Sequence, residues 1–201
     1  MQAFTKELQG AMTPDSAIER LKEGNSRFVK GQQAGNEFMD QVSQTSGGQF
    51  PFAALLSCID SRAPAELLFD QGIGDVFNAR LAGNIVNEDV LGSLEYACKV
   101  AGSKLIVVLG HTKCGAVTAA CNQVKLGNIT PLLDKIQPAV NDIVDGDITD
   151  EMIERVSIRN VERSIQQMRD ESEILNELES EGAIKIVGAI YDVASGKVNF
   201  L

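Results

Sequence analysis

The sequence is poor in residues that mark several protein classes. It has no tryptophan, one histidine and no apolar run of the ~18 residues that a membrane-spanning helix needs. Lysine and arginine number 18 against 28 acidic residues, so the formal net charge is −10. That excess of negative charge argues against binding to nucleic acid or to anionic membranes. We therefore expect neither as a partner.

Cysteine is also scarce. Four cysteines in 201 residues do not make a disulfide scaffold, and a hydrophobic content of 44% is enough for a core without one. The N-terminus lacks the basic region and apolar stretch of a signal peptide. We expect a cytoplasmic protein whose thiols are free, metal-bound or catalytic.

We expect a single domain over residues 1–201, with an N-terminal helical arm and crossing segment at 1–45 and an α/β core at 50–201. Thr13 is a good N-cap and Pro14 suits the first helical position, so a helix begins there. The segment after this helix is polar and rich in Gly, Gln and Ser. This suggests that the helix packs on another surface, for example that of a partner subunit.

Short apolar runs predict buried strands. They are FAALLSC (52–58), GDVFNAR (74–80), KLIVVLG (104–110) and AIKIVGAIYDVASGKVNFL (183–201), the last divided by a turn at Ser195–Gly196. Helical segments separate them, which indicates an α/β fold with a mainly parallel sheet flanked by helices. Such sheets bind ligands beyond the carboxyl ends of their strands.

Four chemically distinctive residues follow two of these strands. Cys58 and Asp60 are two apart in extended chain, so their side chains point to the same side. His111 and Cys114 are three apart where a strand gives way to a helix, which places both on one face of a turn. Two thiolates, an imidazole and a carboxylate together are a suitable ligand set for zinc.

Other readings of these residues are weaker. The chain has no C-x-x-C pair, which disfavours a redox site. The G-x-G in GIGDVFNARLAGN (72–84) lacks the third glycine and the strand-to-helix placement of a dinucleotide-binding motif. Cys98 and Cys121 are isolated cysteines, and we interpret them as small buried hydrophobic residues.

CIDSR (58–62) followed by GHTKCGA (110–116) resembles the C-x-D-S-R and H-x-x-C pattern of the β-class carbonic anhydrases. The resemblance extends over most of the chain, with less diagnostic stretches in the N-terminal helix and near 131–180. Its further motifs are GQFP (48–51), PAEL (64–67), ARLAGN (79–84), GSLEYA (92–97) and YDVASGKV (191–198).

The resemblance implies a β-carbonic anhydrase fold and roles for particular residues. Cys58, His111 and Cys114 would hold Zn²⁺, one ion per subunit. Asp60 and Arg62 would form a carboxylate–guanidinium pair. If Arg62 let go, Asp60 would become a fourth zinc ligand and exclude water.

The resemblance also implies four residues near the substrate. Gln49 would donate a hydrogen bond to the substrate, Phe77 and Tyr96 would contribute apolar lining, and Gly115 would place backbone beside it. Two simpler interpretations remain open from the residues alone. Phe77 and Tyr96 are equally compatible with plain core packing, and Gln49 with an ordinary loop position.

The implied activity is reversible hydration of carbon dioxide to bicarbonate and a proton, through hydroxide on zinc. The implied assembly is a homodimer or homotetramer with the active site near the subunit boundary. One alternative keeps the fold and zinc but hydrolyses a sulfur analogue, carbonyl sulfide or carbon disulfide. Another is a non-catalytic, zinc-stabilised interaction domain, which would need ligands but neither Asp60, Arg62 nor Gln49.

Some members of this family hold an inhibitory bicarbonate in a pocket built from a tryptophan, an arginine and a tyrosine. Arg80 and Tyr191 match the arginine and tyrosine, but Leu55 stands at the tryptophan position. We therefore expect this form of regulation to be absent. We expect Arg80 to make structural or interface hydrogen bonds instead.

Overall fold

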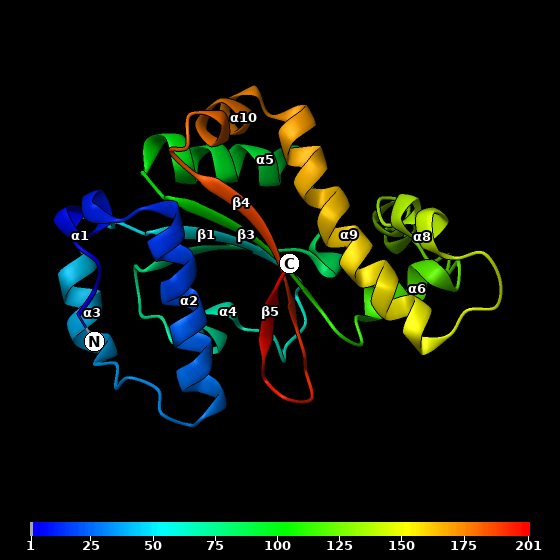
Figure 1. The fold of residues 1–201 in the computed structure, drawn as a ribbon, viewed down its shortest axis with the longest axis horizontal. Helices are drawn as coiled ribbons and strands as arrows, with labels where there is room; N and C mark the ends of the chain where they lie inside the picture. Colours follow the sequence, from blue (N-terminus) through cyan, green and yellow to red (C-terminus); the bar gives the residue numbers. More distant parts are fainter. Residues whose placement is uncertain (1) are drawn as a thin grey trace.

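The computed structural model describes residues 2–201, and its centre is a five-stranded sheet in the order β2-β1-β3-β4-β5 (Figure 1). The first four strands in this order are parallel, and β5 pairs antiparallel with β4. The predicted α/β fold with a mainly parallel sheet is therefore confirmed. The strands are β1 (Ala53–Ser57), β2 (Val76–Arg80), β3 (Leu105–His111), β4 (Lys185–Tyr191) and β5 (Val198–Phe200).

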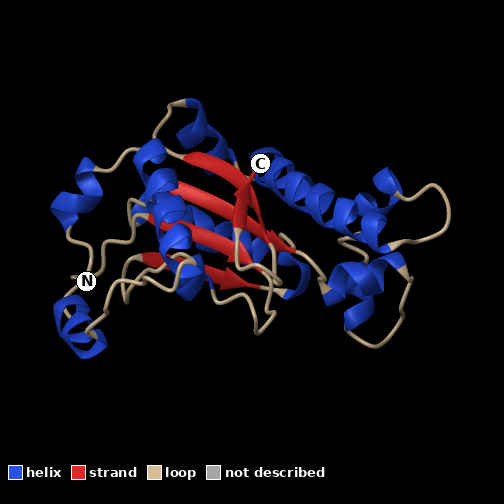
Figure 2. Ribbon diagram, turned by 60° about the horizontal axis from the view of Figure 1, so that its bottom comes forward, coloured by secondary structure: helices blue, strands red, loops and turns tan. Residues whose placement is uncertain are grey.

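Helices cover both faces of this sheet (Figure 2). None of the helices in residues 2–201 is long and apolar enough to cross a membrane. The helical elements are α1 (Lys6–Ala11), α2 (Pro14–Val29), α3 (Phe38–Thr45), α4 (Ala65–Leu68), the 3₁₀ turn η1 (Ala82–Asn84), α5 (Glu88–Glu95), the π-helical turn η2 (Tyr96–Val100), α6 (Gly115–Cys121), α7 (Ile129–Leu133), α8 (Gln137–Ile143), α9 (Asp150–Glu171) and α10 (Glu173–Ser180).

The two faces of the sheet have separate hydrophobic cores. Strands β1 and β3 are buried along their whole length, and alternate side chains point to opposite faces. Leu56 and Val108 pack with helices α5, α9 and α10, whereas Leu55 and Val107 pack with α2 and α4. Burial on both faces explains why these strands appear in the sequence as continuous apolar runs.

The first long helix packs on the sheet of its own chain. Ala17 and Leu21 of α2 are fully buried in the same core as β1 and β3, and Asn25 Nδ2 donates to the carbonyl oxygen of Gly196 at 2.9 Å. The expectation that this helix packs on another surface is therefore wrong. Its apolar side chains belong to the hydrophobic core on one face of the sheet.

The strand order reverses between β1 and β3. After β1 the chain adds β2 on one side of it, and then crosses to place β3 on the other side. Ser57 pairs with Leu109 in the register, so both strands end at the same edge of the sheet. Open α/β sheets bind ligands at such a reversal, next to the carboxyl ends of the strands.

Candidate metal centre

Three ligand side chains meet at this edge of the sheet. Cys58 follows β1, His111 is the last residue of β3, and Cys114 is the N-cap of α6. All three are buried, and their ligand atoms lie within 4.8 Å of one another. Ligands bound about 2.0–2.3 Å from one tetrahedral zinc ion stand roughly 3.3–3.8 Å apart, so the cluster fits such an ion with small adjustments.

The histidine is oriented as a metal ligand would be. Its Nδ1 lies 2.9 Å from the carbonyl oxygen of Thr112, which makes Nδ1 the protonated nitrogen. The other ring nitrogen, Nε2, is buried and has no hydrogen-bond partner within residues 2–201. A buried polar atom without a partner costs free energy, and a bound cation at Nε2 would remove that cost.

The two thiols interact directly. A hydrogen bond from the Cys114 thiol lowers the pKa of Cys58 against the opposing effect of burial, and the His111 side chain and the Gly83 N–H act in the same direction. Donating that proton raises the pKa of Cys114. The Gly83 nitrogen lies 3.3 Å from Cys58 Sγ. A site that stabilises negative charge on sulfur is suited to binding a cation.

The turn between His111 and Cys114 is held by helix α9. Lys113 has a φ of 54°, in the left-handed region that non-glycine residues seldom adopt. Its backbone N–H donates to Glu154 Oε1 at 2.8 Å. Sequence reasoning missed Glu154, because nothing local in the chain relates it to a turn about forty residues earlier.

Asp60 and Arg62 form the predicted pair beside the cluster. Arg62 donates from Nε to Oδ1 at 2.9 Å and from Nη2 to Oδ2 at 2.7 Å. The guanidinium lowers the pKa of the Asp60 carboxyl to about 2. Asp60 Oδ2 lies 3.9 Å from His111 Nε2, yet the carboxylate is not part of the three-residue ligand group. Its role as a fourth ligand stays a prediction.

Arg80 fixes the backbone of the loop that carries Cys58 and Asp60. It donates from Nε to the Cys58 carbonyl oxygen at 3.0 Å and from Nη2 to the Asp60 carbonyl oxygen at 2.6 Å. The expectation that Arg80 makes structural hydrogen bonds is confirmed. The two companion positions, Leu55 and Tyr191, are both buried.

The predicted substrate-contacting residues are dispersed. Gly115 is exposed next to Cys114, and a Cβ added to it would meet open space. Gln49 is exposed in the loop before β1. Because β1 rises about 3.3 Å per residue, its five residues alone separate Gln49 from Cys58 by roughly 16 Å. The structure therefore does not bring Gln49 to the ligand group of its own chain.

Phe77 and Tyr96 lie together but apart from the cluster. Their ring centroids are 6.3 Å apart in an edge-on arrangement. Both line a groove of about 590 Å³ between β2 and α5 that none of the three ligand residues lines. Phe77 packs partly against the hydrophobic core, whereas Tyr96 is 55% exposed. Plain core packing thus describes part of Phe77 but not Tyr96.

The remaining cysteines behave as predicted. Cys98 and Cys121 are both buried among apolar side chains. Burial raises the pKa of Cys98 to about 12 and also raises that of Cys121. Neither belongs to the ligand group, and both pack in hydrophobic clusters.

Comparison with known proteins agrees with this geometry. The family model described as carbonic anhydrase matches residues 53–198. Carbonic anhydrase 2 of Mycobacterium tuberculosis is 35% identical over 190 residues, which covers 92% of this chain and 91% of the relative. The β-carbonic anhydrase CafA of Aspergillus fumigatus superimposes with a TM-score of 0.75 at 26% identity, over 93% of this chain and 89% of that one.

A tetrameric β-carbonic anhydrase of Sordaria macrospora superimposes with a TM-score of 0.72 at 24% identity, over 80% of this chain and 89% of that one. This likeness supports the fold. The family match covers all three residues of the ligand cluster and the Asp60–Arg62 pair. The chain therefore belongs to the carbonic anhydrases, in their β class.

Proposed function

We propose that this carbonic anhydrase hydrates carbon dioxide reversibly with one zinc ion held by Cys58, His111 and Cys114. The observation that carries the proposal is the buried, unpartnered Nε2 of His111 beside two cysteine sulfurs. Three protein ligands leave a tetrahedral ion one further position, which catalytic zinc sites use for water. Bound zinc supplies Lewis acidity, which makes that water a nucleophile near neutral pH.

The protein residues compensate for the charge of the ligands. Two thiolates would cancel the double positive charge of zinc, so the metal would acidify a bound water less. Nearby groups then have to favour the deprotonated form of that water, which is the nucleophile. Asp60 is ionised and can accept a hydrogen bond from the attacking water, which orients that water toward carbon dioxide. Arg62 engages both carboxylate oxygens and so holds Asp60 away from the ligand atoms.

A second copy of the chain would complete the site. Strand β2 is at the end of the sheet, so within residues 2–201 no strand pairs with its outer edge. Two identical edge strands related by a two-fold axis pair antiparallel, with the carboxyl end of one beside the amino end of the other. Phe77, near the amino end of β2, would then approach the ligand group of the second copy.

This arrangement accounts for the dispersed residues. Gln49, Phe77 and Tyr96 are apart from the cluster of their own chain but flank the free edge or the amino end of the sheet. We therefore propose a homodimer, or a homotetramer built from such dimers, in which each copy supplies lining to the other. The tetrameric relative of Sordaria macrospora is consistent with this assembly.

The test is a direct assay of carbon dioxide hydration on the purified protein. We expect rapid hydration, its loss after removal of metal by a chelator, and its recovery when Zn²⁺ is added. Carbonyl sulfide should be assayed in parallel as a competing substrate. A protein that is fully active without metal, or that consumes carbonyl sulfide but not carbon dioxide, would overturn the proposal.

A further inference from the structure

The backbone of Gly83 contacts one member of the ligand group, Cys58. Its φ of 70° lies in the left-handed region, and a Cβ at this position would come within 2.6 Å of Ile136 Cδ1 and 3.3 Å of Ala116 Cβ. A larger residue would therefore have to push the Ile136 side chain aside and would be strained at this φ. The chain needs glycine here to bring the backbone N–H to 3.3 Å from Cys58 Sγ.

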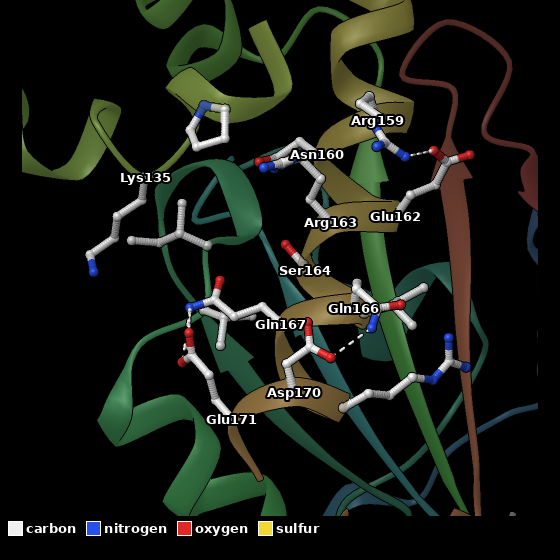
Figure 3. A pocket seen from close by; sticks show the side chains of 15 residues that line it. Lys135, Arg159, Asn160, Glu162, Arg163, Ser164, Gln166, Gln167, Asp170 and Glu171 are labelled. Carbon is white, nitrogen blue, oxygen red and sulfur yellow. Dashed lines mark hydrogen bonds and ion pairs between the residues drawn. The ribbon is translucent and has the colours of Figure 1, made fainter. Parts of the chain in front are cut away.

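Helix α9 holds this segment from the other side. Asn160 Nδ2 donates to the Gly83 carbonyl oxygen at 2.8 Å, and Ser164 Oγ donates to the Asn84 carbonyl oxygen at 3.4 Å. Asn160 and Ser164 are four residues apart, so they share one face of the helix, as Figure 3 shows. Asn160 is 4% exposed and Ser164 is 5% exposed. Both bonds are thus sheltered from water.

The neighbouring arginines of α9 have different partners. Arg159 and Arg163 form ion pairs with Asp142. Together with Asn160 and Ser164 they line a groove of about 670 Å³ along the helix (Figure 3). None of the three ligand residues lines this groove. Asn160 therefore links helix α9 to Gly83, and Gly83 in turn contacts the Cys58 sulfur.

We infer that Asn160 is a positioning residue for catalysis, which acts through Gly83 to aim a hydrogen bond at the metal-binding sulfur of Cys58. Gly83 makes two hydrogen bonds: its N–H donates to the Cys58 sulfur, and its carbonyl oxygen accepts from Asn160. Without the second bond, the left-handed conformation of Gly83 and Asn84 loses one of the contacts that maintain it. The N–H would then drift from the sulfur.

The physical consequence lies in the charge on sulfur. An N–H that donates to a thiolate draws electron density away from it, so the sulfur gives less charge to a bound metal ion. In a site with two thiolates, that withdrawal keeps the metal more electrophilic. This role rests on the proposed function, since it requires a metal ion at Cys58.

The test uses cobalt in place of zinc, because the sulfur-to-Co²⁺ charge-transfer band reports the electron density on sulfur. In Asn160→Leu and Asn160→Asp we expect this band to move to longer wavelength. We also expect kcat of the zinc enzyme to fall about tenfold with little change in KM, the range typical for residues that support a metal ligand. The band is a readout that a merely structural role of Asn160 would not move.

A matched control lies on the same helix. Ser157 is 3% exposed, and its Oγ donates to the Ile153 carbonyl oxygen within α9. Ser157→Ala therefore removes a buried hydrogen bond of α9 without loosening Gly83. We expect its cobalt band and its kcat to match those of the parent protein.

A further measurement needs no substitution. In the parent protein loaded with ¹¹³Cd²⁺, we expect scalar coupling between the metal and the Gly83 amide proton through the sulfur. Absence of this coupling, or an Asn160→Leu protein that folds with the parental cobalt band, would overturn the inference. So would failure of both Asn160 variants to fold, since Asn160 would then serve the fold alone.

The two proposals fail in different ways. If the parent bound neither Zn²⁺ nor Co²⁺, or did not hydrate carbon dioxide, the proposed function itself would be wrong. If the parent bound metal and was active while the Asn160 variants kept its spectrum and rate, only the role of Asn160 would be wrong.

Discussion

Arg62 engages both carboxylate oxygens of Asp60 with its Nε and Nη2, and the same carboxylate lies 3.9 Å from the Nε2 of His111. One negative group therefore stands between a fixed cation and a metal ligand. The orientation of Asp60 depends on whether Arg62 or the metal site binds its carboxylate more strongly. In this structure Arg62 holds it, with a third bond from the Arg62 backbone N–H to Oδ1 at 2.9 Å.

Replacing Arg62 tests this arrangement. Arg62→Lys keeps the charge but cannot form two parallel hydrogen bonds to a carboxylate. Asp60 is then freer to turn toward the metal, and we expect the hydration rate to fall by about 10–100-fold. Stopped-flow measurement of carbon dioxide hydration checks it. Arg155→Lys, at an exposed position on α9, is the control, and a parental rate in Arg62→Lys would contradict the expectation.

The metal ligands are tested by comparing two cysteines. Cys58→Ser replaces a soft thiolate with a weak hydroxyl ligand, so the metal content measured by mass spectrometry should fall well below about one ion per chain. Activity should fall with it. Cys121→Ser alters a buried cysteine outside the ligand group and should keep its metal, at a stability cost of about 1–3 kcal/mol for the buried hydroxyl. Equal metal loss in both variants would refute the assignment.

The proposed assembly predicts an effect of charge at Tyr96. Tyr96 is 55% exposed in the chain, beside the free edge strand. Tyr96→Arg should place an unpaired charge in the interface, weaken association by about 2–5 kcal/mol and shift the protein toward monomers. Sedimentation and light scattering give the mass. The monomer should lose most of its activity, because it lacks the lining from the second copy.

The control for this experiment is another exposed apolar residue. Leu126 is 62% exposed and lies between α6 and α7, away from β2. Leu126→Arg should leave both mass and activity unchanged. A Tyr96→Arg protein with the parental mass would exclude this face as the interface.

An ion pair outside the site contributes to stability in a pH-dependent way. Glu179 on α10 accepts two hydrogen bonds from Arg169 on α9, at 2.7 and 2.8 Å, and one from the backbone N–H of Ile186. Burial opposes ionisation of Glu179, but these bonds outweigh it and lower its pKa. A carboxyl whose pKa is lowered by folding stabilises the protein above its unfolded pKa, about 4.3, and loses that contribution as the pH falls through its folded value.

Glu179→Gln should therefore cost about 1 kcal/mol or less at pH 7, as partly exposed pairs do. The difference from the parent should be smaller at pH 3, because Glu179 of the parent takes up a proton as the pH falls through its folded pKa. Urea unfolding at the two pH values measures this. Glu177→Gln, exposed on the same helix, serves as control, and a difference that grows toward low pH would have the wrong sign.

The grouping of Cys58, His111 and Cys114 could be predicted from the sequence because it depends on short-range order. Cys58 and Asp60 are separated by one residue, and His111 and Cys114 by two, so their relative placement is settled within a single turn. The apolar runs before them predict parallel strands, and parallel strands end at a common edge. Burial of Cys98 and Cys121 could also be predicted, because an isolated cysteine usually behaves as a small hydrophobic residue.

Only the tertiary structure decided what surrounds those ligands. The sequence does not contain the strand order that leaves β2 at the edge, nor the packing of α2 on its own sheet. The contact from Asn160 to Gly83 joins residues 77 positions apart. The physical reason is that local geometry and hydrophobic periodicity act over a few residues. Which distant faces meet is decided by how all the apolar surfaces of the chain are buried together.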